Sequence, residues 1–184
     1  MTKPIIDINI DMSDFLKMAN AIPGVAQDIQ EEMVNGMNES GMLLDTLVAG
    51  WTPVNYGLLR GSIQWPHGFE LQGKGLDELR GIVGAGDQMG ASGVSTSIYV
   101  LPVEEGARPH WAPAQPLKLW AIRKFGNERI GYAVQRHIAL FGTRGAHMFR
   151  NAWLAGGRDG LRRIWEAVPN KVIERVRKRL GGRA

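Results

Sequence analysis

The dipeptide Thr52-Pro53 divides the chain, because it ends any helix that precedes it. Proline fixes its own φ and pushes the residue before it out of the helical region, so a preceding helix stops by Thr52. Gly57 and Gly61 follow, and glycine permits a positive φ or a close backbone approach. Residues 51–63 therefore predict a packed corner between a helix and a sheet. A plain turn without chemistry would account for them too.

The segment before this corner has the period of a helix. From residue 25 to about 48, apolar residues recur at helical spacing, at Ala26, Ile29, Met33, Met37, Leu44 and Leu47. Gly36, Ser40 and Gly41 interrupt good helix formers, at a cost of up to about 1 kcal/mol per glycine. We therefore expect another element to cross the helix closely there. A shorter helix is expected over residues 15–21.

Runs of alternating or β-branched residues predict strands, over residues 6–11, 62–65, 69–71, 79–84 and 97–101. Between the last two runs few side chains are able to pack, which predicts a mobile loop over residues 84–97. We expect this loop to order when a neighbouring subunit arrives. Its candidate docking residues are Gly86, Asp87, Gln88 and Met89.

The second half of the sequence is helical. Apolar spacing predicts helices over residues 117–125, 130–141 and 161–180, the last broken or kinked at Pro169. The fold class is thus α+β, with a small antiparallel sheet of about four strands packed on the long helix and further helices in the C-terminal half. We expect one domain over residues 1–155. A basic helical extension over 156–184 should pack on it or on a neighbour.

Charge is segregated along the chain. Residues 1–50 hold two Lys and eight Asp or Glu, whereas residues 144–184 hold eleven Lys or Arg against three acids. This asymmetry predicts a basic tail for nucleic acid or complementary surfaces on neighbouring subunits. The chain has no cysteine, which excludes disulfides and thiolate metal sites. No apolar run approaches the roughly 20 residues that cross a bilayer, and the N-terminus lacks a signal peptide's apolar core. We expect no membrane partner and folding in the cytoplasm.

No catalytic constellation is complete. Dinucleotide-binding, phosphate-cradling and nucleophile-elbow motifs are absent, and the four histidines lack partners at metal-ligand spacing. Glu104 and Glu105 are adjacent on an expected strand, so their side chains would point to opposite faces rather than form an acid–base pair. We expect both at solvent or at an interface, and we expect no enzyme activity, no metal and no cofactor.

The corner resembles the hallmark of the tail-completion and neck proteins of lambdoid long-tailed bacteriophages, whose usual form is Thr-Pro-x-Asp-Thr-Gly-x-Leu-Arg-x-Ser. The matching residues are Thr52, Pro53, Gly57, Leu59, Arg60, Ser62 and Ile63, whereas Asn55 and Tyr56 stand where Asp and Thr are usual. The likeness continues through Tyr-x-x-x-Val-Glu-x-Gly, a helix containing Trp, Gly-Thr and Phe-x-x-Ala. Those positions are Tyr99, Val103, Glu104, Glu105, Gly106, Arg108, Trp120, Gly142, Thr143, Phe149 and Ala152.

This resemblance implies a structural virion protein of the tail or neck that completes the tail or joins it to the head, assembled in the host cytoplasm. It implies a homo-oligomeric ring, with a hexamer following from tail symmetry. The implied partners are further copies of itself and phage tail-terminator, tail-tube or head-connector proteins. Arg60 and Glu105 are candidates for a structural or intersubunit ion pair. We also expect the acidic residues 1–50 to meet the basic end of a neighbour, including Arg175, Arg177 and Arg179.

The alternative is a basic nucleic-acid-binding protein that uses its C-terminal helix, whose arginines could meet phosphates. Against this, Trp153 and Trp165 lie at apolar helical spacing, which is typical of core residues rather than of stacking platforms. A neck protein works beside a DNA channel, so incidental contact with DNA fits either interpretation.

Overall fold

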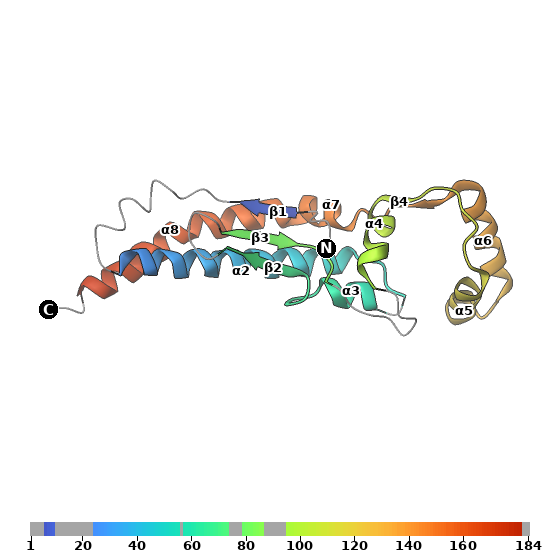
Figure 1. Cartoon of the computed structure of the whole chain (residues 1–184), viewed down its shortest axis with the longest axis horizontal. Helices are drawn as coiled ribbons and strands as arrows, with labels where there is room; N and C mark the ends of the chain where they lie inside the picture. The colour runs from blue at the N-terminus through green and yellow to red at the C-terminus, as the bar shows by residue number, and fades with distance from the viewer. Residues whose placement is uncertain (1–5, 10–23, 56, 74–78, 87–94, 182–184) are drawn as a thin grey trace.

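Two long antiparallel helices and a small sheet form an elongated body, and a helical hairpin projects from one end of it (Figure 1). The computed structural model describes residues 6–9, 24–55, 57–73, 79–86 and 95–181. Its elements, in chain order, are β1 (Ile6–Asn9), α2 (Val25–Trp51), α3 (Leu58–Ile63), β2 (Phe69–Gln72), β3 (Arg80–Val83), α4 (Ser97–Glu105), β4 (Gly106–Ala107), α5 (Ala114–Phe125), α6 (Arg129–Phe141), β5 (Thr143–Arg144), α7 (Met148–Ala152), the π-helical turn η2 (Trp153–Gly157) and α8 (Arg158–Gly181).

Helix α2 is the centre of the body, and it ends where the sequence predicts. Trp51 is its last residue, and Thr52 is extended (φ −74°, ψ 125°) in front of Pro53. The expected close crossings are confirmed. A methyl group on Gly36 would lie 3.0 Å from the Val168 side chain of α8. One on Gly41 would lie 2.5 Å from the Phe69 ring of β2. The two interruptions in α2 thus let α8 and the sheet approach it.

The main sheet is antiparallel and has the strand order β1-β3-β2. Ile6 and Phe69 both pair with Val83 on the central strand, which fixes the register on either side. Val83 is fully buried and belongs to the same apolar cluster as Leu44, Val48, Ile63 and Phe149. A second cluster, between α2 and α8, contains Ile29, Met33, Met37, Val168 and Val172.

Two of the predicted strands are wrong. Residues 97–101 begin helix α4, and the expected strand at 62–65 starts inside α3. Leu59 and Ile63 are buried one turn apart on α3, and Val100 and Glu104 are buried one turn apart on α4. Burial at helical spacing against the core overrides the β propensity of these short runs. Within the described residues the main sheet therefore has three strands, and the separate β4–β5 ribbon has two.

Helix α8 runs antiparallel to α2 along the length of the body (Figure 1). A break or a kink was predicted at Pro169; the helix continues through this residue, so the break is absent. Helices α5 and α6 confirm the two predicted helices, and Gly142 ends α6 with a positive φ of 74°. The short helix expected over residues 15–21 lies outside the described residues.

Candidate assembly interface

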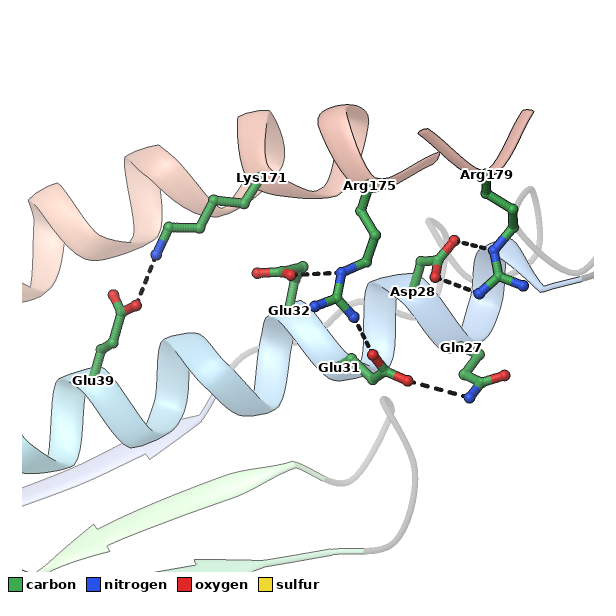
Figure 2. A network of polar contacts seen from close by, with 8 residues as sticks. All are labelled: Gln27, Asp28, Glu31, Glu32, Glu39, Lys171, Arg175 and Arg179. Atoms are coloured by element: carbon green, nitrogen blue, oxygen red, sulfur yellow. Dashed lines mark hydrogen bonds and ion pairs between the residues drawn. The ribbon is translucent and has the colours of Figure 1, made fainter. Parts of the chain in front are cut away.

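The acidic face of α2 and the basic face of α8 bind each other within one chain (Figure 2). Arg179 donates two hydrogen bonds to Asp28, at 2.7 and 2.6 Å. Arg175 pairs with Glu32 at 2.8 Å and also with Glu31. The ladder continues between Lys171 and Glu39 at 2.8 Å. Asp28 and Glu32 are buried, so these arginines neutralise carboxylates that would otherwise be desolvated without a partner.

This ladder corrects the expectation that the two charged ends of the sequence meet between subunits. Arg175 and Arg179, two of the candidate interface residues, hold carboxylates of their own chain. Arg177 lies on the solvent side of α8 and is exposed. The physical reason is the antiparallel packing of α2 and α8, which brings the start of one helix beside the end of the other.

The residues of the corner motif hold one end of the body together. The Thr52 hydroxyl donates to the Val48 carbonyl at 2.7 Å and lies 3.4 Å from the Met148 sulfur, so it ties the end of α2 to α7. The buried Ser62 hydroxyl donates to the Leu59 carbonyl at 2.8 Å. Gly57 adopts a positive φ of 82° directly before α3. These residues make the corner a structural joint.

A second joint connects α4, the β4–β5 ribbon and α7. Glu104 is buried and accepts hydrogen bonds from the backbone N–H groups of Phe149 (3.2 Å) and Arg150 (3.4 Å). Its expected place at solvent or at an interface is therefore wrong, because α4 is a helix that turns this side chain inward. The Thr143 hydroxyl accepts a hydrogen bond from the Ala107 N–H at 2.9 Å.

The conformation and surroundings of Gly106 explain why glycine stands at this position of the motif. It has a φ of 88°, and a side chain there would collide with the backbone of residues 143–145. Gly106 and Thr143, family-like positions on the two strands of the ribbon, are thus set by the conformation and hydrogen bonding of the backbone. Among the described residues, Arg60 and Glu105 form no ion pair with each other, and both are exposed.

The helical hairpin of α5 and α6 (residues 114–141) stands away from the body, beyond the β4–β5 ribbon (Figure 1). Its links back to the corner are few. Arg123 donates a 2.7 Å hydrogen bond to the Asn55 side chain. Trp120 faces Leu58 and other corner residues, together with Tyr99 of α4, across a groove of about 400 Å³. Trp120 and Tyr99, both predicted as family-like positions, therefore line the space between hairpin and body.

The hairpin leaves most of its large apolar side chains at the surface. Within α5 and α6 the buried residues are Ala121, Gly131, Gln135 and Ile138. The exposed large ones are Leu119, Ile122, Phe125, Tyr132, Leu140 and Phe141. Exposed apolar side chains on a projecting element are candidates for a surface that another molecule covers. The hairpin also carries five Lys or Arg and one Glu, a balance equal to the net charge of +4 of the whole chain.

Sequence reasoning missed this surface, although it predicted both helices. Its signal is the number of apolar residues in α6, which exceeds what one packed face against α5 needs. The predicted docking loop is described only in part. Gly86 donates its N–H to the Ser62 carbonyl at 2.8 Å and accepts from the Thr96 hydroxyl at 2.6 Å, so it is tied to the corner. Asp87, Gln88 and Met89 lie outside the described residues.

One buried acid was also missed. Asp45 on α2 is fully buried, and neither of its carboxylate oxygens has a hydrogen-bond partner. It lies beneath the turn at Gly68, where an added methyl group would come within 2.9 Å of one carboxylate oxygen. Burial raises the pKa of this carboxyl to about 7, because desolvation disfavours the charged form.

Comparisons with protein-family models, with curated proteins and with solved structures find no match to this chain. Within the described part of the chain, no helix is long and apolar enough to cross a membrane. Nor do three or more His, Asp or Glu side chains gather as metal ligands among the described residues.

Proposed function

We propose that this chain is a structural component of a tailed bacteriophage, a tail-completion or head–tail joining protein that assembles into a homo-oligomeric ring. One observation carries the assembly part of this proposal. The α5–α6 hairpin projects from the body with six large apolar side chains exposed. Apart from glycine, its buried apolar residues are Ala121 and Ile138. Such an element gains stability when a partner covers it.

The phage part rests on the sequence resemblance across residues 50–155 and on where those positions lie. Thr52 and Ser62 hold the corner at one end of the body, and Gly106 and Thr143 hold the β4–β5 ribbon that leads to the hairpin. We infer that the family-like positions fix the placement of the projecting hairpin, through which a ring subunit could contact its neighbour. The virion location and the phage partners belong to the same proposal.

The charge ladder favours this proposal over a nucleic-acid-binding C-terminal helix. Lys171, Arg175 and Arg179 form ion pairs with carboxylates of α2, and these pairs lower the positive potential that α8 offers to phosphates. Arg177 and Lys178 are exposed on α8 and remain able to touch DNA incidentally.

The experiment that tests the proposal is imaging of particles made without this gene. We expect separate DNA-filled heads and tails, or tails of abnormal length, and rescue by the wild-type chain supplied in trans. Purified protein should sediment as a ring rather than as a 20.3 kDa monomer. Normal, infectious particles in the absence of the gene would refute the proposal. Tight DNA binding by a monomer would support the nucleic-acid alternative instead.

A further inference from the structure

We propose that the outer face of α4 in one copy of this chain packs antiparallel on the exposed face of α6 in the next copy. This outer face consists of Ile98, Leu101 and Glu105. The inference rests on the proposed function, because it specifies how the subunits of that ring meet. It assigns partners to two surfaces that the fold leaves uncovered.

The outer face of α4 is apolar and acidic. Ile98 is 68% exposed and Leu101 is 54% exposed, and Glu105 is exposed one turn further on. The three share one side of the helix because residues three and four apart are neighbours on a helical surface. The opposite side holds the buried Val100 and Glu104. Ile98 and Leu101 therefore contribute little to the core of their own chain.

The exposed face of α6 is apolar and basic. Leu140 is 59% exposed and Phe141 is 70% exposed, and Arg136 is exposed one turn before Leu140. A groove of about 740 Å³ lies beside Phe141, between α6 and β5, lined by Val134, His137, Ile138 and the residues from Gly142 to Arg144. This groove opens at the C-terminal end of α6 and has both apolar and polar residues in its lining.

The two faces match in register. Leu101 and Glu105 are four residues apart on α4, and Leu140 and Arg136 are four residues apart on α6, so each pair spans about 6 Å. With the helices antiparallel, Leu101 meets Leu140 while Glu105 meets Arg136. Ile98 then lies beyond Leu140, toward the C-terminal end of α6. Apolar area is covered at one end of the contact, and opposite charges are paired at the other.

Charge indicates that the occupant is α4 of a second copy rather than a second hairpin. The hairpin has four more basic than acidic residues, so two hairpins would repel each other. Helix α4 contains no Lys or Arg, and the acidic residue Glu105 lies on its outer face. Nucleic acid would also meet the basic residues, but it would leave Leu140 and Phe141 in water. Since the two faces differ, the contact is heterologous, the kind of contact from which a ring is built when its rotation closes.

The test uses two variants that each remove one face. Leu101→Asp destroys the α4 face and Leu140→Asp destroys the α6 face, and both sites are exposed, so folding should be preserved. Sedimentation velocity should show each variant as a monomer. Their equimolar mixture should form a 1:1 heterodimer and stop there, because each variant keeps one intact face. Leu154→Asp, at an exposed apolar residue of η2, is the matched control and should assemble as the wild type does.

Charge reversal tests the register. Glu105→Arg and Arg136→Glu should each weaken assembly by about fivefold, and the double variant should recover most of that loss. Arg144→Glu combined with Glu105→Arg should show no such recovery. Recovery at Arg144 instead of Arg136 would overturn the antiparallel register.

The remaining outcomes separate this inference from the proposed function. If the wild type forms a ring and the Leu101→Asp and Leu140→Asp variants form the same ring, the proposed interface is wrong but the proposed ring stands. A wild type that stays monomeric at every concentration overturns both. If Arg136→Glu abolishes DNA retention while assembly is unchanged, the surface binds nucleic acid and the interface is wrong.

Discussion

Arg179, in the last turns of α8, holds Asp28 at the start of α2 through two hydrogen bonds of 2.7 and 2.6 Å. The two residues are 151 positions apart, and their contact closes the free end of the body. Gly24 makes room for it. Its φ is +85°, and a side chain there would collide with the Arg179 guanidinium. The acidic and basic ends of the sequence are thus used to hold two helices of one subunit together.

Arg175→Gln should destabilise the folded chain, whereas Arg177→Gln should not. Loss of Arg175 leaves the buried Glu32 without its 2.8 Å partner, at a cost of about 1–3 kcal/mol. Arg177 is exposed and keeps the same helix propensity after the change, which makes it the matched control. Thermal unfolding followed by circular dichroism at low and high salt measures the difference. Equal melting temperatures for the two variants would contradict an intrachain ladder.

Asp45 should make stability depend on pH in an unusual direction. Its pKa is about 7 in the folded chain and near the ordinary 3.8 when unfolded, so between those values the folded state holds more protons. Stability therefore falls as pH rises from about 4 to about 7, by up to about 4 kcal/mol, and changes little from this group outside that window.

Asp45→Asn removes this titration while keeping the shape of the side chain. We expect urea unfolding of the variant to vary less between pH 5 and pH 8 than that of the wild type. Parallel pH profiles for the two proteins would mean that Asp45 is charged and solvated in the folded state.

Two glycines of α2 should respond in opposite ways to alanine. At Gly41 an added methyl group meets the Phe69 ring at 2.5–2.8 Å, so Gly41→Ala should cost about 1–3 kcal/mol through overpacking. At Gly50 nothing lies within 4 Å, so Gly50→Ala should stabilise by up to about 1 kcal/mol through helix propensity. Denaturant midpoints of both variants test this. A stabilising Gly41→Ala would place the sheet further from α2 than the structure does.

Glu104 and Glu105 should separate stability from assembly. Glu104→Ala removes the acceptor of two backbone N–H groups at the start of α7, at a cost of about 1.5–3 kcal/mol. Glu105→Ala should leave the melting temperature unchanged and weaken only self-association, because this side chain is exposed. Sedimentation and thermal unfolding of both variants distinguish the two roles, and a destabilised Glu105→Ala would refute the division.

Sequence patterns were sufficient where one local rule decided the outcome. Pro53 ends α2 because its ring excludes a helical conformation at Thr52, whatever the surroundings. The interruptions at Gly36 and Gly41 predicted close crossings, because a glycine in the middle of a helix lowers helix stability unless the missing side chain lets another element approach. The candidate interface was predictable only in part. The sequence predicted both helices of the hairpin, but not which of their faces would be left uncovered.

By itself the sequence determined the long helix and its end, the three strands of the main sheet, the two helices of the hairpin and the segregation of charge. Tertiary structure decided the state of residues 62–65 and 97–101, where short apolar runs suit strand and helix alike and burial of Leu59, Ile63, Val100 and Glu104 selects the helix. It also decided what the charges do. Net charge along a sequence has no direction in space, and only the antiparallel packing of α2 and α8 brings Arg175 and Arg179 onto their own acids instead of a neighbour's.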